Sequence, residues 1–322
     1  MPGLCKFAAP MQIYYDIADF RPLHHAVVTS GTFDGVHLGH QKIIGRLNEI
    51  AATAGGESVV ITYWPHPRLV LYPDDHSLRL LNTFEEKADL LRAHGVQHLL
   101  RIPFTKEFSG ISSLTFIRDI LVDRIGTRKL VIGYDHRFGK NREGSFDQLK
   151  EDAPRYGFEV EEIPRQDIDA LAISSSAIRK HLEAGEAEKA QNLLGRPYSV
   201  TGRVVQGEKL GRVLGFPTAN IDPDSRHKLI PAEGIYAITA DHAGSRYAGM
   251  LYIGRRPTLG GTSQTIEANL FGFDRMIYGE TLTVHFIARI REDIRFSDLE
   301  AMKAQLSIDR QDALRVLESI SN

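Results

Sequence analysis

The sequence predicts two domains of different fold class: an α/β domain with a parallel sheet, followed by a small β-barrel with a C-terminal helix. The first observation is the length, because 322 residues suit about two domains of ordinary size. The second is that strand patterns alternate with helical patterns in the first half. The third is that short strands separated by turns dominate the second half. We place the boundary near Gly185, so the predicted domains are residues 1–185 and 186–322.

The first half begins its alternation at residues 26–30, a short apolar and β-branched run, and a helical stripe follows the turn at Asp34-Gly35. Helices between strands favour right-handed βαβ units and a parallel sheet covered on both faces. Ligands of such folds bind at the carboxyl ends of the strands. The further strands are predicted at residues 58–62, 98–102, 129–133 and 159–163, and the further helices at 83–94, 112–124 and 145–156.

The second half follows two short helical patterns, residues 177–184 and 187–194, which form the predicted connector around Gly185. Short strands with turns between them predict a small barrel. Ser297-Asp298-Leu299-Glu300 has the pattern of a capping box, which predicts a C-terminal helix capped by Ser297. The strand patterns lie at residues 198–206, 234–241, 247–253, 265–270 and 281–289.

Composition narrows the class of protein. The formal net charge of -2 provides no field that would attract nucleic acid or an anionic membrane, so we expect neither partner. The single cysteine, Cys5, excludes an internal disulfide and any multi-cysteine zinc site. No apolar run approaches the length of a membrane span. We expect a cytoplasmic protein, and no particular oligomeric state is predicted.

Two histidines mark the loop that leaves the first strand. His37 and His40 are three residues apart, so on the first turn of the following helix they face the same way. The free N–H groups and the positive dipole end of that helix attract anions, and two imidazoles beside them can donate to phosphate oxygens. The alternatives are a simple helix cap and a metal site. No third ligand lies at metal spacing, which argues against zinc.

A second candidate loop is rich in glycine. Gly207, Gly211 and Gly215 recur at every fourth residue after a strand pattern, so the backbone can turn sharply and approach a phosphate. A glycine-rich hairpin is the alternative. If the chain runs extended after Pro217, Thr218 and Asn220 point to the same face and offer two neutral oxygens, which suit Mg²⁺.

Gly211-Arg212-Val213-Leu214-Gly215-Phe216-Pro217-Thr218-Ala219-Asn220 closely resembles the signature of riboflavin kinases. The resemblance implies that the glycines bind ATP and that Thr218 and Asn220 hold the magnesium of Mg-ATP. It also implies that Glu267, in Ile266-Glu267-Ala268-Asn269-Leu270, is the catalytic base. By pattern alone Glu267 belongs to the polar face of a strand. The sequence departs from the family at Asn269, where His is common, and at Tyr252, where Asn is usual.

Gly31-Thr32-Phe33-Asp34-Gly35-Val36-His37-Leu38-Gly39-His40 resembles the H-x-G-H loop of nucleotidyltransferases, in the form found in FAD synthetases. A Rossmann-like fold follows from this resemblance. Ser174-Ser175-Ser176-Ala177-Ile178-Arg179 resembles the superfamily's second motif, in which the hydroxyls and the arginine bind the triphosphate. By pattern alone these residues are a helix cap and a solvated charge. The residues implied are His37, His40 and Arg179 as catalytic, and Gly31, Phe33, Gly39, Ser174, Ser175 and Ser176 as ATP-binding. Residues 133–139 follow a predicted strand and resemble the family's segment around the flavin phosphate, which implies Asp135 and Arg137 as flavin-binding. His66 also follows a predicted strand, where ligand contacts are expected, and is a further flavin-binding candidate; either segment could instead be a tight turn.

Taken together, the two halves resemble the bifunctional riboflavin kinase and FAD synthetase of bacteria. This resemblance implies riboflavin, FMN and ATP as substrates and Mg²⁺ as the metal. Two alternatives remain. The first half could transfer a nucleotidyl group to another acceptor while the second half only senses flavin. The whole chain could also store or sense flavin nucleotides without turnover.

Overall fold

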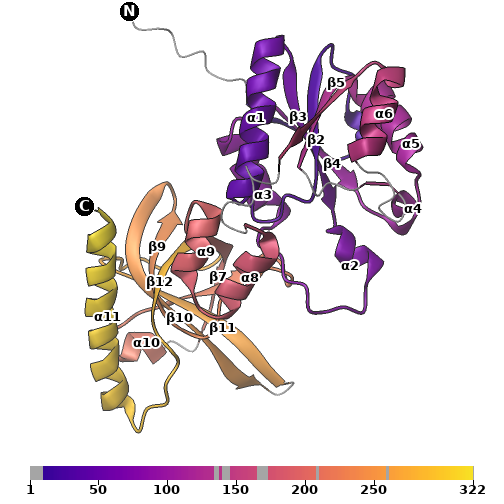
Figure 1. Cartoon of the computed structure of the whole chain (residues 1–322). Helices are drawn as coiled ribbons and strands as arrows, with labels where there is room; N and C mark the ends of the chain where they lie inside the picture. The colour runs from indigo at the N-terminus through magenta and orange to yellow at the C-terminus, as the bar shows by residue number, and fades with distance from the viewer. Residues whose placement is uncertain are drawn as a thin grey trace, which may run out of the picture. The chain divides into compact units, whose positions relative to one another are not determined.

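The computed structural model describes residues 10–133, 138–139, 146–164, 173–207, 210–258 and 261–321 (Figure 1). The chain divides into two compact units. The first comprises residues 1–78 and 84–173, and the second comprises residues 79–83 and 174–322. Gly185 lies between two helices of the second unit, so the predicted functional boundary falls beyond the point where this compact unit begins.

The first unit is built on a parallel sheet, as predicted, and the sheet has six strands where five were predicted. Its strand order is β1-β4-β3-β2-β5-β6. All five neighbouring pairs are parallel. The chain winds from β2 toward one edge and then returns to the other side of β2, so the order reverses between β2 and β5. The strands are β1 (Gln12–Tyr14), β2 (Ala26–Ser30), β3 (Glu57–Trp64), β4 (His98–Pro103), β5 (Thr127–Gly133) and β6 (Glu159–Ile163).

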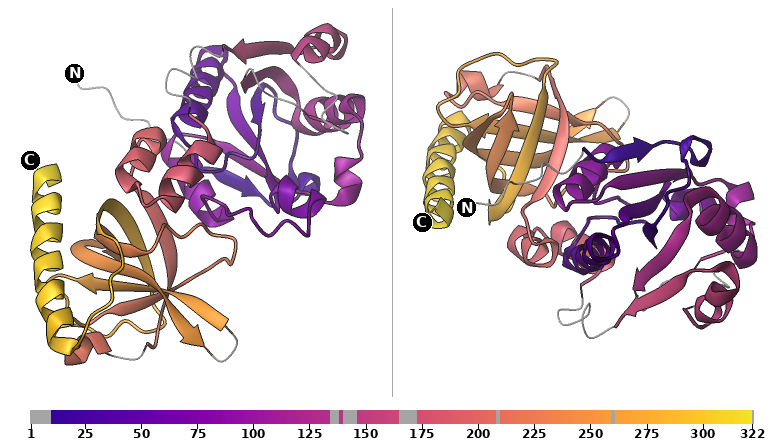
Figure 2. Two further views of the ribbon diagram at one scale, coloured as in Figure 1. Left: turned by 60° about the horizontal axis from the view of Figure 1, so that its bottom comes forward. Right: turned by 90° about the horizontal axis from the view of Figure 1, so that it is seen from above.

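Helices cover both faces of this sheet (Figure 2). Helices α1 (Leu38–Ala54) and α3 (Phe84–Ala93) pack on one face, where Ile44 and Leu91 join a core with Val27 of β2. Helices η2 (Phe116–Ile125) and α6 (Phe146–Tyr156) pack on the other, where Leu149 joins a core with Val28. Adjacent residues of β2 thus enter opposite cores, as the strand period of two requires.

Several short elements complete the unit and were not predicted from the sequence: β1, η1 (Ile17–Asp19), α2 (Pro67–Leu71) and α4 (Lys106–Ser109). The predicted helix at 112–124 is present, but it consists of α5 (Ser113–Thr115) followed by η2, whose hydrogen bonds are of the π type. Such short pieces carry little apolar periodicity, which is why a pattern search misses them.

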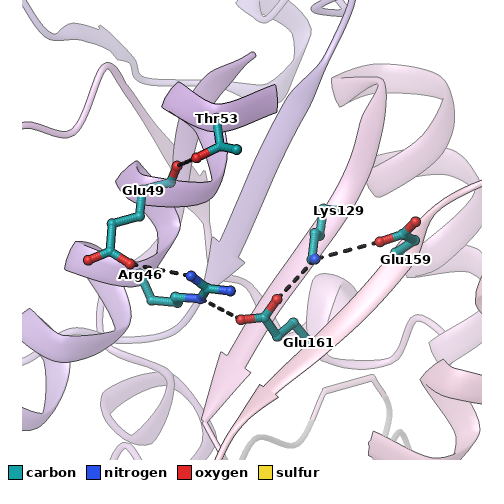
Figure 3. Close-up of polar contacts among 6 residues, drawn as sticks. All are labelled: Arg46, Glu49, Thr53, Lys129, Glu159 and Glu161. Atoms are coloured by element: carbon teal, nitrogen blue, oxygen red, sulfur yellow. Dashed lines mark hydrogen bonds and ion pairs between the residues drawn. The ribbon is translucent and has the colours of Figure 1, made fainter. Parts of the chain in front are cut away.

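An ion-pair network links one helix to two strands (Figure 3). Arg46 of α1 pairs with Glu161 of β6 at 2.6 Å and with Glu49 at 3.3 Å. Lys129 of β5 pairs with Glu161 at 2.9 Å and with Glu159 at 3.5 Å. Glu161 therefore lies between two cations, and hydrogen bonding from Arg46 lowers the pKa of its carboxyl group.

The second unit is a closed barrel, as predicted, with the strand order β10-β11-β8-β7-β12-β9. All of its neighbouring strands pair antiparallel. Tyr198, Tyr236 and Phe286 are among the largest fully buried side chains and lie in its core. The strands are β7 (Tyr198–Val205), β8 (Ala219–Pro223), β9 (Gly234–His242), β10 (Ser245–Thr258), β11 (Gly261–Leu270) and β12 (Thr281–Arg291).

Helices α8 (Ser175–Glu183) and α9 (Ala187–Leu194) bury apolar side chains in the barrel core. Helix α11 (Leu299–Ser321) packs on the outside of the barrel, where Ala313 and Leu317 join a hydrophobic cluster with Met250. The helix is as predicted, but its cap is Asp298 and not Ser297, because an Asp298 oxygen accepts from the Ala301 N–H at 2.8 Å. A carboxylate is a strong acceptor for the free N–H groups at a helix start.

Candidate active sites

The first candidate site lies where the order of the parallel strands reverses. Strand β2 stands between β3 and β5, and the loop of residues 31–37 leaves its carboxyl end. In open α/β sheets, ligands bind outside the carboxyl ends of the strands at this reversal point. Helix α1 begins at Leu38, directly after the loop, and it adds free N–H groups to the same edge.

His37 and His40 come together as the three-residue spacing predicts. Their rings stack, with centroids 3.7 Å apart and an interplanar angle of 16°. His37 is also the cap of α1, because its Nδ1 accepts from the His40 N–H at 3.4 Å. An accepting Nδ1 carries no proton, so a neutral His37 carries its proton on Nε2. The helix-cap alternative is therefore compatible with a functional role for this residue.

His40 is held uncharged by its surroundings. Burial lowers its pKa well below the usual range, and the charges of His37 and Lys87 lower it further. Its Nδ1 is buried and lacks a hydrogen-bond partner among the described residues. The Phe33 ring meets the His40 ring edge-on at 5.1 Å. At Gly31, a Cβ would come within 3.2 Å of the Phe33 ring, so the absence of a side chain there leaves room for the ring beside His40.

The loop between β2 and α1 is strained. Phe33 and Val36 have φ angles of 46° and 40°, in the left-handed region, and Gly35 lies between them at 90°. A non-glycine residue there costs on the order of 1–3 kcal/mol, and such residues cluster at functional sites. Both strained side chains are buried, so core packing offsets that cost.

Lys87 is a residue of this site that pattern reasoning missed. Its ammonium group is buried within hydrogen-bonding distance of the Thr32 carbonyl oxygen, at 2.6 Å. The signal was present in the sequence, because Lys87 occupies a position on the apolar stripe of α3 formed with Phe84, Ala88 and Leu91. A lysine in such a stripe indicates a buried charge with a specific partner.

The remaining predicted residues of the first half have the following places. Gly39 is buried in the first turn of α1, and His66 caps α2 by accepting from the Arg68 N–H at 3.2 Å. Asp135 and Arg137 lie outside the described residues.

The serine-rich segment belongs to the second unit. Ser174 caps α8, with its hydroxyl accepting from the Ala177 N–H at 3.1 Å, and Ser175 and Ser176 form the first turn. Arg179 donates from Nε to the Arg79 carbonyl oxygen at 2.6 Å. The cap predicted from pattern alone is therefore present, whereas Arg179 is not merely a solvated charge.

The second candidate site brings together Thr218, Asn220 and Glu267. The Thr218 hydroxyl donates to a Glu267 carboxylate oxygen at 3.2 Å. Glu267 of β11 is directly opposite Asn220 of β8 in the antiparallel ladder, so the two side chains share one face. Three kinds of oxygen donor, a hydroxyl, an amide and a carboxylate, thus gather on this face. Oxygen donors of this kind suit a hard divalent cation such as Mg²⁺.

The glycines before this site act in two ways. At Gly207, a Cβ would lie 2.3 Å from the Asn220 amide nitrogen, and at Gly211 it would lie 2.3 Å from the Phe216 carbonyl oxygen and 3.2 Å from the Thr218 hydroxyl. Gly215 has a φ angle of 85° and forms the turn before Phe216. The hairpin expected as an alternative is absent from the described part of this segment, where the short helix α10 (Leu210–Val213) follows Gly207.

Asn269 forms a hydrogen bond with the segment that carries Thr218. Asn269 is 7% exposed, and its amide nitrogen donates to the Pro217 carbonyl oxygen at 2.7 Å. Pro217 directly precedes Thr218, so this hydrogen bond fixes the backbone at the start of the segment that carries Thr218 and Asn220. The residue at which the sequence departs from the kinase pattern thus has a defined contact. Tyr252, the other departure, pairs with Glu267 across the ladder, and its hydroxyl donates to Asp293 at 3.2 Å.

A pocket of about 300 Å³ adjoins Thr218. Its walls are mainly apolar and aromatic, and two arginines line it. A volume of this size is at the lower end of the range for small-molecule sites. The lining residues are Val204, Arg212, Pro217, Thr218, Ala219, Ala268, Leu270, Phe273, Asp274, Arg275, Met276, Ile277 and Tyr278.

Comparison with protein families assigns a class to each half. Residues 20–177 match the model of FAD synthetase, and residues 194–317 match the model of riboflavin kinase. The first match contains residues 31–40, the two-histidine loop, and the second contains Thr218 and Glu267. The fold and the two sites therefore define a two-part flavin-nucleotide transferase.

Close relatives cover nearly the whole chain. A bifunctional riboflavin kinase/FMN adenylyltransferase of Pseudomonas fluorescens is 37% identical over 301 residues, which are 93% of this chain and 96% of the relative. The protein of the same name from Bacillus subtilis is 34% identical over 300 residues, 92% of this chain and 93% of the relative. The chain belongs to the bifunctional riboflavin kinase/FMN adenylyltransferase family.

A solved structure shares the fold. The crystal structure of a macrolide-efflux protein from Streptococcus pneumoniae has a TM-score of 0.84 and 28% sequence identity, over 94% of this chain and 97% of that one. Among the described residues of the present chain, every helix is too short or too polar to cross a membrane.

Proposed function

We propose that this chain makes FAD from riboflavin in two steps on two sites. The second unit transfers the γ-phosphoryl group of ATP to the 5'-hydroxyl of riboflavin and yields FMN and ADP. The first half transfers the adenylyl group of a second ATP to FMN and yields FAD and pyrophosphate. The observation that carries the proposal is the match of both family models, in this order, on one chain whose sites have the chemistry each step needs.

The kinase step needs a base, and Glu267 is the candidate. A sugar-type alcohol is protonated at neutral pH, so phosphorylation benefits from a carboxylate that accepts its proton as the oxygen attacks the γ-phosphorus. The hydrogen bond from the Thr218 hydroxyl to the Glu267 carboxylate supports this role, because Thr218 is one of the proposed metal ligands. Mg²⁺ held by Thr218 and Asn220 would neutralise charge on the phosphates. The mainly apolar pocket beside Thr218, whose lining includes Phe273 and Tyr278, suits the planar ring of a substrate.

The adenylyl step needs no base, because the phosphate of FMN is already an anion. Its oxygen attacks the α-phosphorus of ATP while the bond to the β-phosphate oxygen breaks, and pyrophosphate leaves with that electron pair. The catalytic task is then to position the phosphates and stabilise the developing charge. A neutral His37 with its proton on Nε2 can donate a hydrogen bond to a phosphate oxygen. His40, held neutral by burial, can donate in the same way.

The other predicted residues complete the proposal. Gly31, Phe33 and Gly39 shape the ATP site of the first half. Gly207, Gly211 and Gly215 shape the ATP site of the kinase. Ser174, Ser175, Ser176 and Arg179 bind the triphosphate in adenylyl transfer, and Asp135, Arg137 and His66 bind flavin. The functional boundary is placed near Gly185, and the protein acts in the cytoplasm on riboflavin, FMN and ATP.

A chromatographic time course tests the proposal. Purified protein is incubated with riboflavin and Mg-ATP, and riboflavin, FMN and FAD are followed for the wild type, His37→Ala and Asn220→Ala. We expect His37→Ala to stop at FMN. Asn220→Ala should leave riboflavin unconsumed but still convert added FMN to FAD. A wild type that makes no FMN would contradict the kinase assignment and favour a flavin-sensing second half.

A further inference from the structure

Lys87 is a buried lysine beside the two-histidine loop, and no step described so far uses it. It lies on α3 and is 2% exposed. The other members of its helical stripe, Phe84, Ala88 and Leu91, are buried and apolar. A buried ammonium group is destabilising unless hydrogen bonds and a nearby negative charge compensate its lost hydration. Its retention in this stripe therefore requires specific partners.

The partners of Lys87 lie at the carboxyl ends of two central strands. Its Nζ donates to the Thr32 carbonyl oxygen at 2.6 Å and to the Thr62 hydroxyl at 3.3 Å. The Thr62 hydroxyl donates in turn to the same Thr32 carbonyl at 3.3 Å. The Trp64 ring faces the ammonium group, with its centroid 5.4 Å away. Lys87 thus links α3, β3 and the first residues after β2.

The Thr32 carbonyl is the point at which the loop departs from strand geometry. This carbonyl belongs to the peptide plane that joins Thr32 to Phe33, the first residue with a positive φ angle. A hydrogen bond to the carbonyl fixes the orientation of that plane. The orientation determines where Phe33 points, and the Phe33 ring packs against His40. Lys87 therefore controls a strained turn whose end carries both histidines.

Lys87 also acts on the histidines electrostatically. Burial lowers the pKa of Lys87 to about 8, and the charge of Asp34 partly opposes that shift, so the side chain is mostly charged at neutral pH. Burial is the main cause of the lowered pKa of His40, and the charges of His37 and Lys87 lower it further. A positive charge at this position disfavours a second one on His40 and helps to keep that ring neutral.

We infer that Lys87 is a positioning residue for adenylyl transfer: by holding the Thr32 peptide it sets the strained loop that places His37 and His40. The inference rests on the proposed adenylyl transfer by the first half. Because it concerns the loop of one unit, it leaves the kinase step of the other unit unaffected. The same protein preparation therefore contains its own control activity.

The variant Lys87→Met tests this role, because it removes the charge and keeps an unbranched side chain of similar length. In the full-length protein, we expect the kcat of adenylyl transfer to fall on the order of 10- to 100-fold, as for a catalytic group displaced by about 1 Å. The KM for ATP should change much less, and riboflavin phosphorylation should stay at the wild-type rate. Lys106→Met removes an exposed lysine of the same unit and should leave both activities unchanged.

The protonation of His40 supplies a second readout. Removal of the Lys87 charge should raise the pKa of His40 toward its usual value. An NMR titration of histidine-labelled protein measures this shift, with His40→Gln used to assign the resonance. A lysine that only fills space would leave this pKa unchanged, and that result would contradict the inference.

Retention of adenylyl-transfer kcat within about threefold of wild type in folded Lys87→Met would overturn the inference. If that variant does not fold, Thr62→Val decides, because it removes one partner of the ammonium group and conserves the side-chain shape. We expect Thr62→Val to lower the adenylyl kcat about 3- to 10-fold, the scale of one lost hydrogen bond, and an unchanged kcat would overturn the inference. A wild type that makes no FAD from FMN would instead disprove the proposed function.

Discussion

Both proposed sites depend on a glycine-containing loop, but different groups hold the two loops in place. The loop after β2 is held by a buried cation, Lys87, and by aromatic packing of Phe33. The segment before β8 is held by an uncharged amide, Asn269, and by glycines that pack against the donor side chains. The first arrangement keeps His40 neutral, mainly through burial, whereas the second leaves the Glu267 carboxylate half-buried beside oxygen donors. Each environment suits its step, because only the kinase step requires a base.

The largest expected effect distinguishes riboflavin phosphorylation from adenylyl transfer. Glu267→Gln keeps the shape of the side chain but removes the proposed base, so riboflavin phosphorylation should fall on the order of 10²- to 10⁴-fold. Conversion of added FMN to FAD should be unaffected. Steady-state rates of both steps measure this difference. A near-normal kinase rate in Glu267→Gln would show that the barrel site works without this base.

A smaller effect is expected where a glycine makes room for a proposed metal ligand. In Gly207→Ala the new Cβ would overlap the Asn220 amide group, which must then move. We expect the kinase kcat to fall on the order of 10- to 100-fold, since small displacements of positioned groups are costly. Gly45→Ala on α1, where a Cβ meets nothing within 4 Å, is the matched control and should leave the kinase unchanged. Equal kinase rates in both variants would contradict the packing argument.

Asn269 is expected to contribute less, because it acts one residue away from the donors. Asn269→Ala removes the hydrogen bond to the Pro217 carbonyl, and a bond of this kind is worth about 0.5–1.5 kcal/mol. We expect the kinase kcat to fall several-fold while adenylyl transfer is unchanged. Asn269→Asp removes the donor, keeps the size and turns a buried carboxylate toward a carbonyl oxygen, so it should lower the kinase kcat at least as much as the alanine variant. Wild-type kinase activity in both variants would assign Asn269 a purely structural role.

The weakest expected effect concerns stability at low pH. Hydrogen bonds from Arg246, and a further contact with His285, lower the pKa of Asp241 in the barrel to about 2. A carboxyl whose pKa is depressed in the folded state stabilises it above the unfolded pKa near 3.8, and this contribution is lost as the pH falls toward 2. The pair is partly exposed, so we expect at most about 1 kcal/mol. Thermal unfolding of wild type and Asp241→Asn between pH 5 and pH 2, values chosen to bracket that window, should show the difference shrinking with acidity.

Glu161 of the first unit, like Asp241 of the barrel, is a carboxylate whose pKa is lowered by pairing with an arginine. Arg46 and Lys129 lower the pKa of its carboxyl group, and its side chain is 27% exposed (Figure 3). Glu161→Gln should therefore cost no more than about 1 kcal/mol at neutral pH, and high salt should reduce this cost. Thermal unfolding at low and high ionic strength measures it. A salt-independent loss would contradict a surface ion-pair origin.

The sequence alone determined the fold class and the common face of those residues in the two candidate sites whose positions follow from local spacing. The three-residue interval between His37 and His40 predicts their common face, because helical geometry relates residues at that distance wherever they occur. The two-residue interval between Thr218 and Asn220 predicts a common face of a strand in the same way. The alternation of strands and helices likewise predicts the parallel sheet, and the sheet predicts which loop faces a ligand.

The tertiary structure decided what these loops are held by, since the helical stripe of the sequence marks Lys87 as a buried charge but does not give its partner. Lys87 and Thr32 are 55 residues apart in the sequence, and Asn269 and Pro217 are 52 apart. Neither contact has a periodicity that a local pattern could reveal, since each depends on how separate elements pack. The same holds for Gly207, whose missing side chain matters only because Asn220 lies against it. Local geometry is encoded in neighbouring residues, whereas the support of a site depends on contacts that exist only once the chain has folded.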